Sequence, residues 1–475
     1  MRRRGTGETP DSAPTEAVRL AIRELRPPRR LVAGAAGSVG TARIVLLQCW
    51  PNERVVVLTL AAVTDEQAPG LLAGVRVIES SLLGPGHLGT FLADLGADVI
   101  KVESPAGDYI RQMTWPIVEG VSLLHLHTHR GKRSITLDLK NPAGRQLYMD
   151  LAATADVVVE AMRPGTLARL GLGFDVLSAS NPRLVFATLS GYGATGPYKD
   201  MPSHGIAYDT WSGIVQPVVD DEGFTRIPPD MPNVGINVGP MLAALAVLAA
   251  VIKARDTGEG CEIEVAQSDA SAYMDWYRIE SERAYLRPDD EVTGNPSDNH
   301  ERRPAGLAGM WEGVRYQAYA AADGHVLFMA SEQAFWRNFC EGVDRMDLYE
   351  RWPGSTYADH ARGNTELQHE LKAIFATKTC EEWLTFSNEV NTPIAPFNTP
   401  ANIGDDPQFQ ARIGFLPTDE VGCEQLPLPV YVDGAKPANP SKAPTVGQHT
   451  EGVMGDVLGL DADRIAILRA DGAFG

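Results

Sequence analysis

The chain has 475 residues, of which 44% are hydrophobic, and its formal net charge is −19 at pH 7 with a pI near 5.0. A chain of this length is too long for one simple core and suits a large domain that carries a smaller one. The excess of acidic residues excludes nucleic acid as the main partner, because phosphate binding needs clustered positive charge.

The cysteines and the apolar segments argue against a disulfide-rich, metal-binding or membrane-spanning protein. The five cysteines are scattered without paired spacing, so they predict neither a disulfide framework nor a metal site, and they fit a reducing cytoplasm. The longest apolar segment, residues 241–252, is too short to span a bilayer and is followed by Lys253 and Arg255. We therefore expect a cytoplasmic protein without a membrane partner, in which this segment is a buried core helix.

Residues 1–70 differ in composition from the rest of the chain. Arginines stand at both ends of residues 1–30, but four acidic residues interrupt them, and a transit peptide is poor in such acids. We expect a flexible appendage, with a β-like run at residues 54–60.

The first strongly patterned segment is residues 74–103, which begins GVRVIESSLLGPG. Residues 75–78 predict a strand, and the Gly-Pro-Gly turn at residues 84–86 reverses the chain, because proline fixes φ and glycine frees it. Apolar residues then recur at helical spacing up to Gly96, and residues 99–102 predict a second buried strand. This is a βαβ unit. It needs a parallel sheet, whose ligands bind where the carboxyl ends of strands meet the following turns.

Strand and helix patterns continue to alternate after this unit. Residues 134–139 alternate like a strand, and Asn141 and Pro142 open an amphipathic helix. Further strands are predicted at residues 155–160 and 183–189. The alternation predicts an α/β fold whose large domain is a doubly wound, Rossmann-like parallel sheet.

The composition turns polar at residues 282–303, which predicts a linker between the first part of the large domain, residues 71–281, and a smaller domain. We expect this smaller α+β domain at residues 304–390, with a strand at residues 326–330 and helices that begin near Phe335 and Glu381.

Three motifs in the large domain carry a resemblance to a known family. Residues 131–140 read GKRSITLDLK, residues 160–165 read EAMRPG, and residues 190–197 read SGYGATGP. In this order and at these distances they resemble the motifs of family III CoA-transferases, the CaiB/BaiF group that includes formyl-CoA transferase and the α-methylacyl-CoA racemases. The resemblance covers residues 71–475. It implies a return segment at residues 391–475 that completes the large domain, and an interlocked homodimer.

The resemblance also implies where coenzyme A binds, because in relatives these segments hold the adenosine diphosphate end of the molecule. The matching positions are Leu137, Lys140, Met162, Arg163 and Arg169. Arginine and lysine at turns after parallel strands suit phosphate, with which they make charge-assisted hydrogen bonds. Any single one of them is more often an ordinary surface charge. Ser104 stands where relatives often place an arginine.

The main departure from the family concerns its nucleophile. Transferases of the family use an aspartate that attacks the acyl-CoA thioester and then becomes an aspartyl-CoA thioester. Counting from the flanking motifs places this position on Gly235 or Ile236, which have no carboxylate. Asp209 is our candidate for a relocated nucleophile, and Asp230, in a proline-flanked loop, is a weaker one. A regular helix from His204 would turn Asp209 roughly 140° away from it, which favours a solvent-facing or capping role instead.

His204 matches an acid/base histidine of the racemases, and Glu332 matches a second racemase residue. Each also has an ordinary structural interpretation. A lone histidine is commonly structural, and an acid in front of a helix is favoured by the helix dipole.

Three functions follow from these observations, and we rank a CoA-transferase that moves coenzyme A between carboxylic acids first. The second is an acyl-CoA racemase or isomerase that uses His204 and Glu332. The third is a non-catalytic acyl-CoA-binding subunit of a two-chain transferase, because some relatives have two subunits of which one lacks the aspartate.

We expect no metal and no cofactor, with coenzyme A as a substrate. The expected partners are acyl-CoA, carboxylic acids, and a second copy of the chain or a second family III subunit. The acyl group itself does not follow from the sequence.

Overall fold

The computed structural model describes residues 70–295, 300–302, 310–355 and 359–475, together with four strands within residues 32–59. By its internal contacts the chain divides into two units, Met1–Ala68 and Pro69–Gly475. The strands of the first unit form an antiparallel sheet of β1 (Val32–Ala33), β2 (Gly37–Val39), β3 (Ala42–Cys49) and β4 (Arg54–Thr59). β4 coincides with the β-like run predicted at residues 54–60. The expected flexible appendage otherwise lies outside the described residues.

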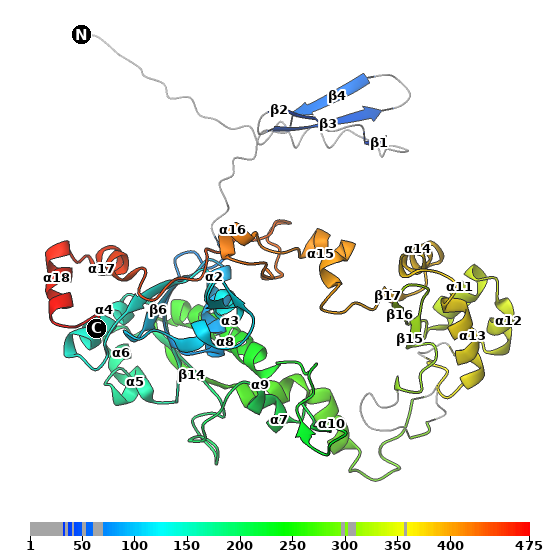
Figure 1. The fold of residues 1–475 in the computed structure, drawn as a ribbon, viewed down its shortest axis with the longest axis horizontal. Coiled ribbons are helices and arrows are strands. Elements are labelled where there is room, and N and C mark those ends of the chain that lie inside the picture. The colour runs from blue at the N-terminus through cyan, green and yellow to red at the C-terminus, as the bar shows by residue number, and fades with distance from the viewer. Residues whose placement is uncertain are drawn as a thin grey trace, which may run out of the picture. The chain divides into compact units, whose positions relative to one another are not determined.

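A six-stranded sheet organises the second unit (Figure 1). Its strands are β5 (Arg76–Ser81), β6 (Asp98–Glu103), β9 (Arg133–Thr136), β10 (Val157–Ala161), β11 (Val185–Ser190) and β14 (Cys261–Ala266). All neighbours are parallel, in the order β14-β11-β10-β5-β6-β9. The chain builds outward from β5 through β6 and β9, and then adds β10, β11 and β14 on the other side. The predicted α/β fold with a doubly wound parallel sheet is confirmed, and its switch point lies between β5 and β10.

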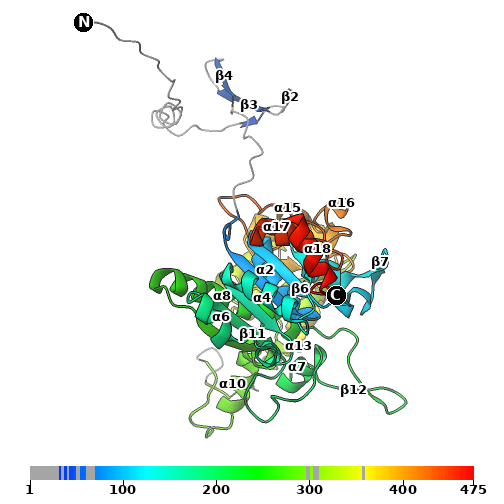
Figure 2. The ribbon, with the colours of Figure 1, turned by 90° about the vertical axis from the view of Figure 1, so that its left-hand side faces the viewer.

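Helices cover both faces of this sheet (Figure 2). α2 (His87–Asp94) and α8 (Gly235–Thr257) pack on one face, through a core that includes Leu88 and Val247. α4 (Pro142–Ala153) and α6 (Phe174–Ser180) pack on the other, around Tyr148 and Leu177. α4 begins as predicted, because the side chain of Asn141 accepts a hydrogen bond from the Ala143 N–H at 2.8 Å.

The carboxyl-terminal segment packs on the same face as α4. α17 (Thr450–Leu458) contacts α4 and β9, and α18 (Ala462–Ala470) follows it. The His449 N–H donates to the carbonyl of Ser134 at 2.8 Å, and Val453, Met454 and Phe474 are buried in the core of the large domain. The end of the predicted return segment therefore lies in that core.

α8 is longer than the apolar segment predicted at residues 241–252. It is the one helix of the described residues that is long and apolar enough to cross a membrane by length and composition. Half of its most apolar stretch is buried inside the fold, as in a core helix of a folded domain. Its other face exposes Met241, Leu245 and Ile252.

A three-stranded antiparallel sheet forms the smaller α+β domain. Its strands are β15 (Gln317–Ala320), β16 (His325–Phe328) and β17 (Ile394–Pro396). Its helices are α11 (Gln333–Gly342), α12 (Met346–Arg351), α13 (Thr365–Phe375) and α14 (Cys380–Val390). Packed aromatic rings, among them Phe339, Phe375 and Trp383, fill the core of this domain.

Two boundaries differ from the prediction. α10 (Trp276–Ala284) runs into the polar stretch predicted as a linker, because exposed charged residues suit a solvated helix as well as a loop. β17 belongs to the predicted return segment by sequence but pairs with β16 of the smaller sheet. A strand of three residues carries too little periodicity to be assigned to a sheet from the sequence.

The remaining elements connect these layers. They are η1 (Gly84–Gly86), η2 (Tyr109–Gln112), β7 (Ile117–Val118), β8 (Val121–Ser122), α3 (Leu123–His129), α5 (Thr166–Arg169), α7 (Ile206–Ser212), β12 (Val218–Val219), β13 (Thr225–Arg226), α9 (Gln267–Met274), η5 (Ile403–Asp405), α15 (Pro407–Arg412) and α16 (Thr418–Val421).

Candidate functional site

Two adjoining cavities open at the carboxyl ends of the central strands. The larger cavity, of about 860 Å³, lies among the turns that follow β5, β10 and β11, and residues 199–204 also line it. The smaller cavity, of about 400 Å³, lies at the ends of β5, β6 and β9. Leu82, Met162 and Arg169 line both cavities, so the two form one continuous site. This is the edge of the sheet where the βαβ unit predicts a ligand.

All five residues predicted to bind coenzyme A line these cavities. Met162 and Arg169 line both, and Arg163 lines the larger cavity. Leu137 and Lys140 line the smaller cavity, in the turn after β9. The topology therefore gathers residues from two motifs that are about thirty positions apart in the sequence, as the parallel sheet predicts.

Glu160 makes hydrogen bonds to the backbone of the turn and short helix that carry Arg163 and Arg169. The Glu160 carboxylate accepts hydrogen bonds from the Gly165 N–H at 3.2 Å and from the Leu167 N–H at 2.6 Å, and burial raises the pKa of this carboxyl. Gly165 has a φ of 73°, a conformation that glycine adopts at little cost. The turn thus presents two guanidinium groups to the cavities on a backbone with few free torsions.

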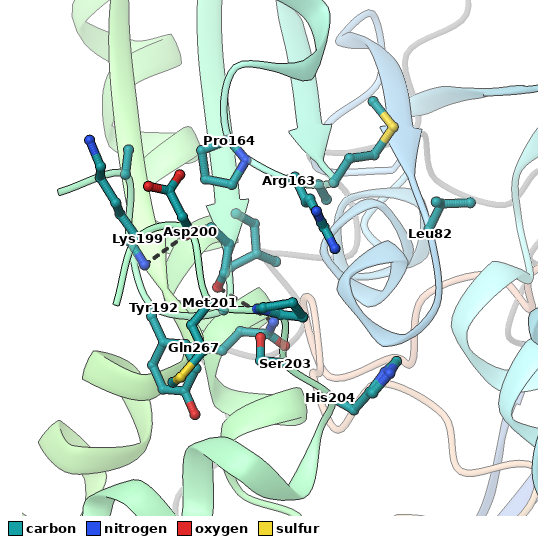
Figure 3. A pocket seen from close by; sticks show the side chains of 18 of the residues that line it. Leu82, Arg163, Pro164, Tyr192, Lys199, Asp200, Met201, Ser203, His204 and Gln267 are labelled. Atoms are coloured by element: carbon teal, nitrogen blue, oxygen red, sulfur yellow. Dashed lines mark hydrogen bonds between the residues drawn. The ribbon is translucent and has the colours of Figure 1, made fainter. Parts of the chain in front are cut away.

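His204 lines the larger cavity together with the predicted nucleotide-binding side chains (Figure 3). It stands on the segment before α7. The Ser203 hydroxyl lies 3.1 Å from the hydroxyl of Tyr208, and burial raises the pKa of Tyr208. Gly205 permits the close approach of α8, because a Cβ at this position would lie 2.7 Å from Cγ2 of Ile236.

Asp209 lies outside both sets of cavity-lining residues and is fully buried. Its Oδ1 accepts hydrogen bonds from the Gly235 N–H at 2.8 Å and from the Ser271 hydroxyl at 2.7 Å. Its Oδ2 accepts one from the Val234 N–H at 3.1 Å. These are the contacts of a carboxylate that caps the amino terminus of α8. The catalytic role of Asp209 stays a prediction, and the geometry favours the capping interpretation.

Glu332 is the residue that precedes α11 in the smaller domain, and it makes no capping hydrogen bond through its side chain. It is not among the residues that line either cavity. Within the described part of this chain, the structure therefore does not bring His204 and Glu332 into one cavity. The role of Glu332 as an acid or base stays a prediction.

Several polar residues of the larger cavity were not singled out individually from the sequence, among them Tyr192, Lys199, Asp200 and Gln267. Tyr192 belongs to the S-G-Y-G motif, and its ring contacts those of Tyr208 and Trp211. Lys199 and Asp200 follow that motif directly, so proximity to the motif was the available signal. Gln267 follows the edge strand β14, and no motif of the sequence surrounds it.

The charges around the larger cavity are mostly positive. Arg163, Arg169 and Lys199 line it, and Asp200 is the carboxylate among the described residues that do so. Such a cavity suits anionic ligands, because each guanidinium or ammonium group makes charge-assisted hydrogen bonds to phosphate or carboxylate.

Comparisons with known proteins agree with this geometry. The sequence model of the family described as CoA-transferase family III matches residues 72–450. The chain is 31% identical to the succinyl-CoA–L-malate CoA-transferase beta subunit of Chloroflexus aurantiacus, over 84% of this chain and 97% of that protein. It is 32% identical to the probable fatty acyl-CoA transferase Rv3272 of Mycobacterium tuberculosis, over 66% of this chain and 79% of that protein.

A solved structure shares the fold. The crystal structure of a CaiB/BaiF family protein from Brucella suis superposes with a TM-score of 0.64 at 26% identity, over 82% of this chain and 99% of that one. The resemblance inferred from the three motifs is therefore confirmed. The chain belongs to CoA-transferase family III, and it is an enzyme that moves coenzyme A between carboxylic acids.

Proposed function

We propose that this enzyme takes coenzyme A from the thioester of a short dicarboxylic acid and passes it to a second carboxylic acid. Succinyl-CoA is the thioester with which we test this proposal. The observation that carries the proposal is the lining of the larger cavity by Arg163 and Lys199, in addition to Arg169, which we assign below to the phosphates of coenzyme A. A fatty acyl chain has no charged group to pair with these cations, whereas a second carboxylate on the acyl group finds cationic partners here. One relative is named for succinyl-CoA and L-malate and another for fatty acyl-CoA, and the cationic lining favours the former class.

We place the nucleotide end of coenzyme A in the smaller cavity. Lys140 and Arg169 are the cations there that can pair with its phosphates, and Leu137 and Met162 offer apolar contacts. The pantetheine arm then passes Leu82 and Met162, which line both cavities, and brings the thioester beside His204. The proposed reaction needs no cofactor, because coenzyme A is itself carried by the substrate, and the proposed compartment is the cytoplasm.

Asp200 is our proposed nucleophile, because it is the carboxylate of the larger cavity among the described residues. Its oxygen would attack the thioester carbonyl, the C–S bond would break, and coenzyme A would leave as a thiolate from a mixed anhydride. The thiolate would then attack the aspartyl carbonyl, which gives an aspartyl-CoA thioester and releases the first acid. The carboxylate of the second acid would reverse these two steps and regenerate Asp200. His204 can donate a hydrogen bond to the carbonyl oxygen on which negative charge develops.

Assembly into a homodimer is part of the proposal. The exposed face of α8 carries Met241, Leu245 and Ile252, which recur at helical spacing and are 51%, 64% and 63% exposed. A row of exposed apolar side chains on one helix favours coverage by another chain. A second family III subunit is the alternative, because the relative from Chloroflexus aurantiacus is named a beta subunit. Sedimentation at micromolar concentration tests this, and a stable monomer would contradict it.

The activity is tested by incubating the purified chain alone with succinyl-CoA and a set of carboxylic acids, and by measuring which CoA thioesters form. We expect new CoA thioesters of dicarboxylic or hydroxy-dicarboxylic acids and no turnover of palmitoyl-CoA. Turnover of palmitoyl-CoA but not of succinyl-CoA would contradict the proposed substrate class. Exchange of the α-proton into deuterated water without transfer would favour the isomerase alternative instead.

A further inference from the structure

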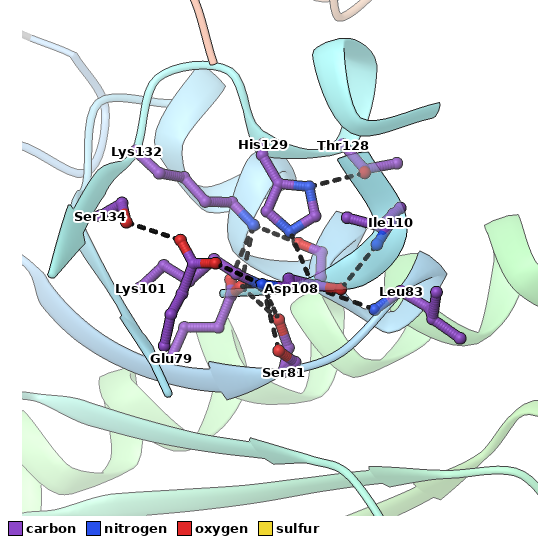
Figure 4. Close-up of polar contacts among 12 residues, drawn as sticks. Glu79, Ser81, Leu83, Lys101, Asp108, Ile110, Thr128, His129, Lys132 and Ser134 are labelled. Atoms are coloured by element: carbon purple, nitrogen blue, oxygen red, sulfur yellow. Dashed lines mark hydrogen bonds and ion pairs between the residues drawn. The ribbon is translucent and has the colours of Figure 1, made fainter. Parts of the chain in front are cut away.

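A cluster of buried charged residues contacts the turn that lines both cavities, and Figure 4 shows the contacts of this cluster. Glu79, Lys101, Asp108 and Lys132 are each at most 3% exposed. The turn consists of residues 81–86 and follows β5. Its outer side lines the cavities, with Ser81 and Leu82 on the smaller one and Leu82 and Leu83 on the larger one.

Three polar groups of the turn's backbone are held by this cluster. The Lys101 ammonium donates to the carbonyl of Ser81 at 3.0 Å, and the Lys132 ammonium donates to the carbonyl of Gly86. Between them, the Leu83 N–H donates to Oδ2 of Asp108 at 3.2 Å. Lys101 and Lys132 are themselves paired with Asp108 at 3.0 Å and with Glu79 at 2.8 Å.

Leu83 needs this support more than its neighbours do. Its φ is 62° and its ψ is −148°, a conformation that side chains other than glycine rarely adopt. A backbone in such a conformation persists only where the surrounding structure holds it. The hydrogen bond from its N–H to Asp108 is the contact that fixes this peptide group.

The partners of Asp108 require a carboxylate rather than an amide. Oδ2 accepts from the Leu83 N–H and from Lys101, and Oδ1 accepts from the Ile110 N–H at 3.0 Å. An asparagine offers one oxygen and one NH₂ group, so its NH₂ would face at least one of these donors. The remaining neighbour is His129, whose Nε2 lies 3.9 Å from Oδ2 and whose pKa burial lowers, so that it adds no charge.

Asp108 is held in place in turn. Its N–H donates to Oε2 of Glu103 at 2.8 Å, and Arg111 pairs with both oxygens of Glu103 at 2.6 and 2.8 Å. The support therefore reaches from the end of β6 to the turn between the cavities, and Glu103 and Asp108 themselves also line the smaller cavity.

We infer that Asp108 is a positioning residue for the transfer reaction. Through its hydrogen bond from the Leu83 N–H it holds the turn at residues 81–86 in place. This turn lies where the arm of coenzyme A passes from one cavity to the other. This inference rests on the proposed function for its kinetic consequence. The structural part, a Leu83 N–H held by one carboxylate, rests on the contacts alone.

The test compares Asp108→Asn with Asp94→Asn. Asp94 forms a buried ion pair with Arg130 at 2.7 Å and lines neither cavity, so the second variant controls for the loss of a buried carboxylate. Both are assayed with succinyl-CoA at a temperature at which each is folded. We expect kcat/KM to fall at least tenfold in Asp108→Asn and less than twofold in Asp94→Asn. Equal effects of the two substitutions would overturn the inference.

Two further measurements separate positioning from general stability. Amide hydrogen exchange of the peptide that contains residues 81–86 should accelerate in Asp108→Asn and stay unchanged in Asp94→Asn. Unchanged exchange at this turn in both variants would overturn the inference. Should Asp108→Asn fail to fold, the double variant Lys101→Met with Asp108→Leu replaces the pair by apolar groups, which buried pairs often tolerate. It should fold and still lose activity, and wild-type activity in it would overturn the inference.

The kinetic and structural parts can fail separately. If the wild-type chain does not transfer coenzyme A, the dissociation constant of coenzyme A replaces kcat/KM as the measured quantity. It should rise about tenfold in Asp108→Asn and stay unchanged in Asp94→Asn. An unchanged dissociation constant in Asp108→Asn would overturn the inference independently of the proposed reaction.

Discussion

The buried carboxylate of Asp209 accepts a hydrogen bond of 2.8 Å from the N–H of Gly235, 26 positions further along the chain. Gly235 is one of the two positions where the family resemblance implies a nucleophilic aspartate. A Cβ added there would lie 2.8 Å from Cβ of Tyr208 and 3.3 Å from Oδ1 of Asp209. In this chain, the carboxylate of Asp209 from α7 therefore caps the amino terminus of α8. A second carboxylate, on a side chain at position 235, would not fit beside it.

Replacing Asp209 should lower stability rather than act on chemistry. Asp209→Ala leaves the Val234 and Gly235 N–H groups without this acceptor and removes one of the two partners of the Ser271 hydroxyl, the other being the Ser212 hydroxyl at 2.9 Å. We expect the free energy of unfolding in urea to fall by about 1–3 kcal/mol. Asp230→Ala, which changes an exposed loop carboxylate, is the control and should have no effect. A stable but inactive Asp209→Ala variant would contradict this purely structural role.

Restoring the family's carboxylate at position 235 should not help the enzyme. Gly235→Asp would press its Cβ against Tyr208 and place a second negative charge beside Asp209. We expect a lower urea midpoint and no gain in kcat for CoA transfer. A higher kcat would mean that a side chain at position 235 reaches the larger cavity, which contradicts the contacts described above.

Arg169 should contribute directly to the affinity for coenzyme A. It lines both cavities, and its Nη2 donates to the Thr166 hydroxyl at 2.9 Å, which aims the guanidinium group. Arg169→Ala should weaken binding by roughly 1.5–3 kcal/mol, the usual size for a hydrogen bond to a charged group. Calorimetry measures this, with the exposed Arg464→Ala as the matched control. An affinity equal to that of the control would remove Arg169 from the site.

Acid should destabilise the protein through its buried histidines. Burial lowers the pKa of His87 to about 3, and that of His125 and of His127 to about 4. Between about pH 6.5 and 4 the unfolded chain therefore binds protons that the folded chain does not, so stability is lost as the pH falls through this window.

The histidine variant His125→Gln tests this dependence. The free energy of unfolding should drop between pH 7 and pH 5 in the wild-type chain, and it should drop by roughly 1–2 kcal/mol less in the variant. Parallel curves for the two proteins would show that His125 does not carry a lowered pKa in the folded state.

The local pattern of the sequence was sufficient to predict the large sheet. The β-branched strands, the Gly-Pro-Gly turn and the Asn141 cap are each determined by neighbours within a few positions, and all appear in the structure. The predicted coenzyme A residues come together for the same reason, because a parallel sheet places the ends of its strands at one edge.

Pairings between distant residues could not be predicted. Lys101 reads as an ordinary residue of a strand, yet it is fully buried, because Asp108 and the Ser81 carbonyl surround its ammonium group. Asp209 looks like a residue of the reaction motif, and its role as a cap depends on the start of α8, 26 positions away. Gln267 and Asp200 reach the larger cavity through the sheet topology and the course of a loop, neither of which leaves a periodic signal.

The most direct test of the proposed mechanism locates the acylated residue. The purified chain is mixed with succinyl-CoA, trapped with hydroxylamine or borohydride, and analysed by peptide mass spectrometry. We expect a modified Asp200, no modification in Asp200→Asn, and loss of CoA transfer in that variant, with Asp230→Asn as the unaffected control. A label on Asp209 or Asp230, or full transfer activity in Asp200→Asn, would contradict it.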